Sequence, residues 1–192
     1  MADCVVVDPG EEPERVLAAL GELGLSCAAV VVTHSHLDHI GAVGAVARAA
    51  TCPVYTSAGD ASVVAHVNDH LWPGFGPYVE HAPEGRLVPG ERLELAGMAI
   101  DVIDTPGHHP HAVSLLLTGP EGDQLLAAGD VLFAGSVGRT DLEGGDWDVL
   151  AASIGRLVDA VDHDVPVLPG HGPVTTLRRE LATNPFLTGL AG

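Results

Sequence analysis

The sequence predicts an α/β fold, in a single domain that spans residues 1–192. Short apolar runs with strand character alternate with longer segments of helical periodicity along the chain, which is typical of α/β proteins. Several of these apolar runs end in a small residue followed by a histidine or an aspartate. A chain of 192 residues is long enough for one sizeable core and too short for two independent domains.

The first half of the chain is predicted to alternate strands with helices. The expected elements are a strand at 4–10, a helix at 11–24, a buried strand at 27–34, a helix at 40–50, a strand at 52–57 and a helix at 58–68. The helix at 11–24 repeats apolar residues every three or four positions and has Gly24 near its end. The strand "CAAVVVTH" is apolar up to its last two residues, as expected of a strand covered on both faces.

The second half is predicted to contain more strands. They are expected at 98–104, 112–118, 124–129 and 165–170, with helices at 146–161 and 176–183. The stretch 69–90 differs, because it is rich in proline and glycine and holds Trp72, Phe75 and Tyr78. It fits either a mobile binding loop or a loop packed onto the core.

The charge balance excludes one class of partner. The chain has 8 basic residues, all of them arginine, against 26 acidic ones, and its net charge is −18. Such a field repels a nucleic-acid backbone, so we expect no nucleic-acid partner. No apolar run approaches a membrane span and no signal peptide is visible. We therefore expect a soluble cytoplasmic protein that acts on a small molecule, in an oligomeric state left open.

The three cysteines are predicted to have no chemical role. Cys4, Cys27 and Cys52 are isolated in the sequence and odd in number, which argues against a disulfide framework. Their neighbours are apolar, so we expect small buried thiols.

The segment "THSHLDH" at 33–39 carries the densest group of metal ligands. It begins where a strand ends and continues into a helix. Alternate residues of a strand point the same way, so His34 and His36 can converge on one ion. Asp38 and His39 follow after the chain has turned and can face a second point nearby. This spacing favours a site at the end of a strand that serves more than one metal.

More ligands are expected from distant strand ends. His108, Asp130 and His171 each follow an apolar strand and a small residue. A carboxylate such as Asp130 can bridge two cations and bring them within about 4 Å of each other. Histidine nitrogen with carboxylate oxygen suits Zn²⁺, with Fe or Mn as alternatives. We therefore expect two divalent metal ions as cofactors.

The motifs together resemble the metallo-β-lactamase superfamily. H-x-H-x-D-H is followed by T-P-G-H, G-D and P-G-H-G-P, and "GDVLFAGSVGRTDLEGGD" and "TNPFL" look most like the glyoxalase II-like branch. The resemblance implies an αββα four-layer sandwich with the metals at one edge of its sheets. It assigns the first metal to His34, His36 and His108, the second to Asp38, His39 and His171, and the bridge to Asp130.

The sequence departs from the family pattern in three places. Family members usually have about two further strands before the segment matching "VVVDPG", so the first sheet is expected to be shortened. The usual "TPGHTPGS" is "TPGHHPHA" here, and we expect His109 and His111 to support His108 or to lie on the surface. We expect no counterpart of the helical domain that binds glutathione in glyoxalase II, which leaves the thiol carrier open.

The predicted function is metal-dependent hydrolysis of thioesters or related esters. Two cations supply a hydroxide nucleophile at neutral pH, and Asp38 or Asp130 is expected to orient it as a catalytic residue. A thiolate leaves without a separate general acid, because its pKa is only about 8.5.

Three other functions stay open at this stage. They are a mononuclear iron dioxygenase acting on persulfides, with two histidines and one aspartate on the iron, a lactonase, and a protein whose metal is structural or regulatory. Arg139 and Asp141 in "GRTD" fit a substrate contact or, preferably, an internal ion pair that shapes the loop after Asp130.

Overall fold

The computed structural model describes residues 2–188, which form two compact units of mixed helix and sheet. The first unit comprises the residues up to Val88 together with Glu94–Gly97, and the second comprises Pro89–Leu93 and the residues from Met98 onward. Both units hold proposed metal ligands. The assignment of the whole chain to one domain stays a prediction.

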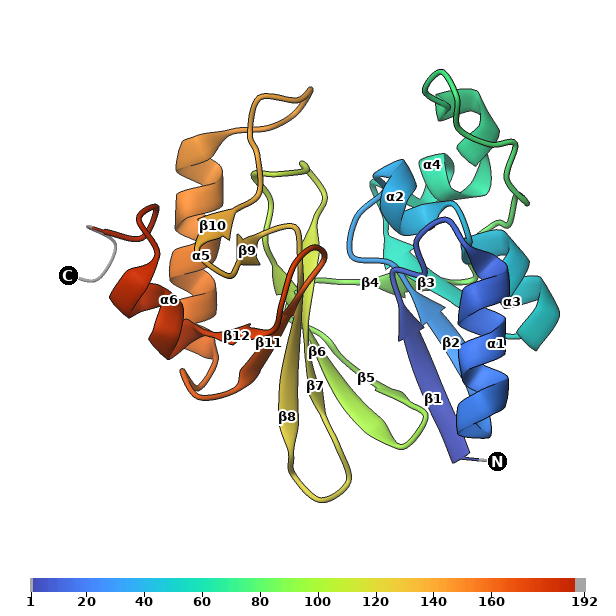
Figure 1. Ribbon diagram of the computed structural model, residues 1–192, viewed down its shortest axis with the longest axis horizontal. Helices are drawn as coiled ribbons and strands as arrows, with labels where there is room; N and C mark the ends of the chain where they lie inside the picture. Colours follow the sequence, from blue (N-terminus) through green and yellow to red (C-terminus); the bar gives the residue numbers. More distant parts are fainter. Residues whose placement is uncertain (1, 189–192) are drawn as a thin grey trace. The chain divides into compact units, whose positions relative to one another are not determined.

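The first unit is built on a parallel four-stranded sheet with the order β1-β2-β3-β4 (Figure 1). Its strands are β1 (Ala2–Val7), β2 (Leu25–Val31), β3 (Val54–Ser57) and β4 (Gly85–Leu87). Parallel neighbours need a crossover, usually a helix. The crossovers are α1 (Pro13–Leu23), then α2 (Leu37–Ile40) with α3 (Val43–Ala50), then α4 (Ala61–Ala65) with the 3₁₀ helix η1 (Val67–His70).

The core of the first unit lies between the sheet and its helices. Helices α1 and α3 both pack on β2, and Val30, Val32, Ile40 and Val46 at this interface are at most 2% exposed. Helix α1 ends at the glycine that the sequence predicts: Gly24 has φ 64°, a left-handed conformation that glycine adopts without cost.

Part of the stretch 69–90 is a packed loop. Val79 lies so close to α3 that a Cβ on Gly44 would come within 1.8 Å of its carbonyl oxygen. The Asn68 side chain accepts from the Tyr78 amide at 2.8 Å and donates to the Tyr78 carbonyl at 3.0 Å. These contacts favour the packed-loop interpretation for Tyr78 and Val79, whereas Trp72 is 53% exposed. The short strand β4 at the end of this stretch was not predicted.

The second unit is built on a six-stranded mixed sheet with the order β12-β11-β8-β7-β6-β5. Its strands are β6 (Met98–Asp104), β7 (Val113–Thr118), β8 (Gln124–Gly129), β11 (Pro166–Pro169), β12 (Thr175–Thr176) and β5 (Arg92–Leu95), of which Glu94 and Leu95 are assigned to the first unit. Strands β6, β7 and β8 form an antiparallel meander, and β11 joins β8 in parallel. A separate two-stranded ribbon is formed by β9 (Leu132–Phe133) and β10 (Ser136–Val137).

Helices α5 (Trp147–Ala160) and α6 (Leu177–Thr183) complete the second core. Leu150, Ile154 and Leu157 of α5 are fully buried against residues of β8 and β11. Both helices begin at a side-chain cap: Asp146 accepts from the Val149 amide, and Thr176 accepts from the Arg179 amide. The starts of α5 and α6 therefore have a local cause in the sequence.

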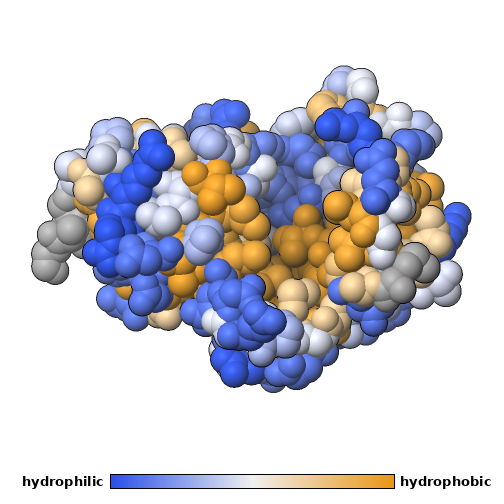
Figure 2. Space-filling model, turned by 60° about the horizontal axis from the view of Figure 1, so that its bottom comes forward, coloured by the Kyte–Doolittle hydropathy of each residue, from blue (hydrophilic) through white to orange (hydrophobic). Residues whose placement is uncertain are grey.

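Apolar side chains also reach the surface of the chain. Figure 2 shows hydrophobic residues, in orange, among hydrophilic ones on the face that it presents. The larger exposed apolar side chains include Leu23, Trp72, Val174 and Phe186. No helix within residues 2–188 is both long and apolar enough to cross a membrane.

Candidate metal centre

The first half-site, defined as His34, His36, Asp38 and His39, lies at the carboxyl end of β2. The strand ends at Val31 and α2 begins at Leu37, so the motif occupies the turn between them. His34 is completely buried, and its Nε2 lies 3.2 Å from Nδ1 of His36. The predicted convergence of these two imidazoles is therefore present within the first unit.

The other two residues of this half-site, Asp38 and His39, lie on α2. His39 is 2% exposed, and its ring centroid lies 4.1 Å from that of His34. Asp38 is exposed, and its Oδ2 lies 3.9 Å from Nε2 of His39. The His34 ring is thus near both His36, at 4.8 Å between centroids, and His39, so the division of the motif into two metal-binding pairs stays a prediction.

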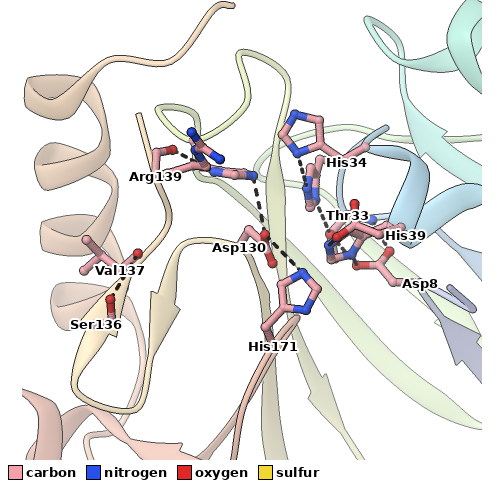
Figure 3. Close-up of polar contacts among 12 residues, drawn as sticks. Asp8, Thr33, His34, His39, Asp130, Ser136, Val137, Arg139 and His171 are labelled. Atoms are coloured by element: carbon pink, nitrogen blue, oxygen red, sulfur yellow. Dashed lines mark hydrogen bonds and ion pairs between the residues drawn. The ribbon is translucent and has the colours of Figure 1, made fainter. Parts of the chain in front are cut away.

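Asp8 is a supporting residue that the sequence analysis missed. Its carboxylate accepts hydrogen bonds from the Thr33 amide at 2.8 Å and the Thr33 hydroxyl at 2.6 Å, and lies 2.9 Å from Nδ1 of His39 (Figure 3). A carboxylate on Nδ1 leaves Nε2 as the nitrogen that can bind a cation. Asp8 follows the parallel strand next to β2, so its place after "CVVV" was the available signal.

The backbone at Asp8 is in an uncommon conformation. Its φ is 45°, in the left-handed region that residues other than glycine enter at some cost. The network around the carboxylate holds this conformation. Strain of this kind often accompanies functional sites.

A second buried carboxylate supports the same turn. Asp60 precedes α4, is 1% exposed, and accepts a hydrogen bond from the Ser35 hydroxyl at 3.0 Å. Ser35 separates His34 from His36 in the sequence. Asp60 therefore fixes the backbone that carries His34 and His36.

The second half-site, defined as His108, Asp130 and His171, lies at strand ends of the second unit. Asp130 comes directly after β8, His171 follows β11, and His108 is in the β6–β7 connection. Oδ2 of Asp130 lies 3.4 Å from Nε2 of His108 and 3.6 Å from Nε2 of His171 (Figure 3). Asp130 and His108 are buried, whereas the His171 side chain is 54% exposed.

The protein fixes the orientation of His108 through backbone contacts. Its Nδ1 donates to the Arg139 carbonyl at 2.8 Å, which leaves Nε2 with its lone pair toward Asp130. Gly138 allows the chain to pass closely, since a Cβ there would lie 1.9 Å from the Asp130 carbonyl oxygen. The buried Ser153 hydroxyl of α5 donates to the Pro106 carbonyl at 2.5 Å and holds the loop before His108.

The expected ion pair beside this half-site is present. Arg139 binds Asp141 through two hydrogen bonds of 2.6 and 2.7 Å, and both side chains are exposed. Hydrogen bonding from the guanidinium lowers the pKa of Asp141 to about 2. The ion-pair interpretation of "GRTD" is thus confirmed.

His109 is a neutral neighbour of the second half-site. Burial, with the adjacent imidazoles of His111 and His108, lowers its pKa to about 4. The ring therefore carries no positive charge at neutral pH to oppose a cation bound at His108. The rings of His109 and His111 lie 6.0 Å apart between centroids.

The donor distances fit metal binding in each half-site. Two ligands about 2.05 Å from one tetrahedral Zn²⁺ lie roughly 3.4 Å apart. The His34–His36 nitrogens are separated by 3.2 Å, and Asp130 Oδ2 lies 3.4 and 3.6 Å from its two imidazole nitrogens. Groups of histidine and carboxylate at these spacings, with their other atoms held by the protein, match the chemistry of the expected ions.

These features define a mixed α/β protein with histidine and aspartate clusters at strand ends, and sequence comparison gives its family. The profile of the metallo-beta-lactamase superfamily matches residues 2–175, so the chain belongs to that superfamily. The chain is 35% identical over 199 residues to the probable metallo-hydrolase YqgX of Bacillus subtilis, covering 98% of this chain and 89% of YqgX. It is 31% identical over 189 residues to the hydroxyacylglutathione hydrolase GloC of Haemophilus influenzae, covering 96% and 87%.

Solved structures give the same result for the fold. The BLEG-1 B3 metallo-beta-lactamase matches with a TM-score of 0.87 at 35% identity, over 98% of this chain and 90% of that one. TTHA1623 in a di-iron-bound form matches with a TM-score of 0.81 at 40% identity, over 94% and 88%. ETHE1 from Myxococcus xanthus matches with a TM-score of 0.76 at 27% identity, over 98% and 76%. The predicted metallo-β-lactamase fold is confirmed, and the chain is a metallo-hydrolase-type enzyme with a histidine-rich candidate metal site.

Proposed function

We propose that the chain is a dinuclear metal-dependent hydrolase of thioesters, with both half-sites supplying ligands to one centre. His34, His36 and His108 would hold the first ion, Asp38, His39 and His171 would hold the second, and Asp130 would be the ligand that both ions share. The observation that supports this most is Oδ2 of Asp130, which lies 3.4 and 3.6 Å from two imidazole nitrogens. This oxygen therefore lies within ligand-to-ligand distance of one histidine from each proposed ligand set, as expected of a carboxylate that two ions share.

The protein's own groups prepare this centre for hydrolysis. When two divalent ions are bound, they lower the pKa of water toward neutrality and polarise a carbonyl oxygen. Asp8 and the Arg139 carbonyl hold Nδ1 of His39 and His108, so both rings present Nε2. Asp130 aligns the nucleophile, and the exposed carboxylate of Asp38 can pass a proton to solvent.

A thioester is the substrate class that this set of residues favours. Thiolates leave without prior protonation, since their pKa is about 8.5, and the centre then needs no further general acid. The hydroxyacylglutathione hydrolase GloC, a relative at 31% identity, supports the same class. Zn²⁺ is the proposed metal, and iron is the main alternative because TTHA1623 binds two irons. We also propose that the enzyme acts in the cytoplasm.

Metal content and a substrate panel test the proposal together. Protein purified without chelator should contain about two metal ions per chain, and the zinc-loaded enzyme should release thiol from a glutathione thioester. The panel includes a lactone, a β-lactam and a glutathione persulfide, the last followed by oxygen uptake. One iron per chain with oxygen uptake would instead identify a persulfide dioxygenase, and hydrolysis confined to the lactone would identify a lactonase.

A substitution at the bridge tests the assignment of ligands. Asp130→Asn keeps the size of the side chain but removes its charge, so metal content should fall to about one ion per chain and turnover should drop by at least about 100-fold. Asp141→Asn is the matched control, because Asp141 lies in the same connection but is exposed and paired with Arg139. Two retained metals and normal turnover in Asp130→Asn would show that Asp130 is not the bridge.

A further inference from the structure

All three cysteines of the chain, which are isolated in the sequence, lie together in the first unit. Cys4 on β1 and Cys27 on β2 are direct partners in the parallel pairing of these strands. Cys52, just before β3, has its Sγ 3.6 Å from Sγ of Cys27. All three are free thiols, and Cys27 and Cys52 are only 6% and 7% exposed.

We propose that Cys27 and Cys52 are a modification site at which a low-molecular-weight disulfide such as oxidised glutathione forms a reversible protein disulfide. A disulfide needs its sulfurs about 2.05 Å apart. The two sulfurs lie 3.6 Å apart, so they must approach each other by about 1.6 Å to form the bond. The two thiols already face each other, since one donates a hydrogen bond to the other.

A pocket borders one of the two cysteines. A cavity of about 470 Å³ is lined by Cys52, Arg48, His81 and Glu84, whereas Cys27 is not among its lining residues. This volume is in the range of small-molecule sites. The Arg48 guanidinium offers charge to the carboxylates of a peptide disulfide. Glu84 opposes them less than a free carboxylate would, because it accepts from the Val54 amide at 2.9 Å and lies 3.0 Å from His81 Nε2.

The reaction has two exchange steps that balance. The Cys52 thiol loses its proton to water, and its sulfur attacks the small disulfide, forming a mixed disulfide and releasing one small thiolate. The Cys27 thiol then loses its proton, and its sulfur attacks the Cys52 sulfur, which releases the second small thiolate. The products are the Cys27–Cys52 disulfide and two small thiols, so two electrons pass from the protein to the reagent.

Burial makes these steps slow at neutral pH. Desolvation is the largest cause that raises the pKa of Cys27, to about 12, and it also raises the pKa of Cys52. Since only the thiolate attacks, the rate of disulfide formation should rise about tenfold per pH unit between pH 7 and 9. Cys4 also has a raised pKa.

The position of the pair gives the modification its consequence. Cys27 and Cys52 are 25 positions apart in the chain, and the segment between them contains the whole first half-site. A disulfide would tie together the two ends of the segment that carries four proposed ligands. Closing a loop of this length should raise the melting temperature by about 10 °C, reversibly on reduction.

The experiment is incubation of the full chain with oxidised glutathione at pH 8.5, followed by thiol counting under denaturing conditions and peptide mapping. The thiol count should fall from the three of the sequence to one, with Cys27 and Cys52 in one linked peptide pair. Cys27→Ala should instead accumulate glutathione on Cys52, and Cys52→Ala should leave Cys27 reduced. Cys4→Ala is the matched control and should form the same linked pair as the wild type.

Several results would overturn the proposal. They are a wild-type chain that keeps Cys27 and Cys52 reduced, thiol loss confined to Cys4, and glutathione on Cys27 in the Cys52→Ala variant. The wild-type mapping alone decides the pairing, so the test stands even where a variant folds poorly. Because it measures thiols and not turnover, its result is independent of the proposed hydrolase activity.

Discussion

At the scale of single residues, Asp8 determines which ring nitrogen of His39 is left for a metal ion. Its carboxylate lies 2.9 Å from His39 Nδ1 and accepts two hydrogen bonds from Thr33. Asp8→Asn should weaken metal binding about 10- to 100-fold, because removing a carboxylate partner of a ligand histidine costs that much. Competition with a chelator measures the affinity.

Asp3→Asn is the control for this prediction, since Asp3 lies on the same strand but is exposed. An Asp8→Asn chain that binds metal as tightly as Asp3→Asn would contradict a positioning role for Asp8.

The proposed ligand residues were recognisable from the sequence, whereas the residues that support them were not. His34, His36, His108 and Asp130 stand out because they follow apolar runs in dense or repeated patterns. Asp8 and Asp60 are single carboxylates without such a pattern. Their supporting role can be recognised only in the folded chain, where the parallel strands bring them beside "THSHLDH". The contact of Cys27 with Cys52 depends on the same tertiary pairing.

At the scale of elements, replacing glycine by alanine on two helices should change the free energy of unfolding in opposite directions. Gly44→Ala on α3 places a Cβ 1.8 Å from the Val79 carbonyl oxygen, so the free energy of unfolding should fall by about 2 kcal/mol or more. Gly21→Ala on α1 meets no atom within 4 Å and should raise it by about 0.5–1 kcal/mol.

Denaturant unfolding of the two glycine variants measures both changes. Equal effects of the two substitutions would mean that the loop at Val79 does not pack on α3.

A buried glutamate should hold several short elements of the second unit together. Glu180 of α6 is fully buried and accepts from the Gly135 amide at 2.7 Å and from the Asn184 amide group at 2.9 Å. It also accepts from the Thr175 hydroxyl. Glu180→Ala leaves these donors buried without an acceptor, so unfolding should become easier by about 3 kcal/mol.

Glu22→Ala on the exposed face of α1 is the control for Glu180 and should change stability by less than about 0.5 kcal/mol. Chemical denaturation of both variants provides the comparison. A Glu180→Ala chain as stable as Glu22→Ala would contradict the role of this network.

Long elements were predictable from sequence, and very short ones were not. Strands β6, β7 and β8 and helices α1 and α5 match their expected ranges within a few residues, since each has enough residues to show a period. Strands β4, β9, β10 and β12 have two or three residues each, too few for any pattern. The network around Glu180 holds β12 and the turn between β9 and β10, whereas β4 pairs with the neighbouring strand β3.

At the scale of the whole molecule, removing metal should lower stability. Ions that bind only the folded chain stabilise it in proportion to the logarithm of their concentration, by about 4 kcal/mol at 1,000 times the dissociation constant. Treatment with a chelator should therefore lower the melting temperature, and added Zn²⁺ should restore it.

A variant that lacks His36 and His171 is the control for metal removal, and its melting temperature should barely respond to chelator. An equal response in the wild type and in this variant would place the stabilising metal elsewhere.

The left-handed backbone at Asp8 has a further consequence for selection. Gly would adopt φ 45° more easily than Asp, so Asp8→Gly removes strain from the turn after β1 while it deletes the carboxylate that orients His39. The same substitution leaves the buried Thr33 amide and hydroxyl without their acceptor, and this loss outweighs the relief of strain. A screen that rewards heat resistance alone would therefore tend to retain Asp8, so the carboxylate that positions His39 is also kept by selection for folding.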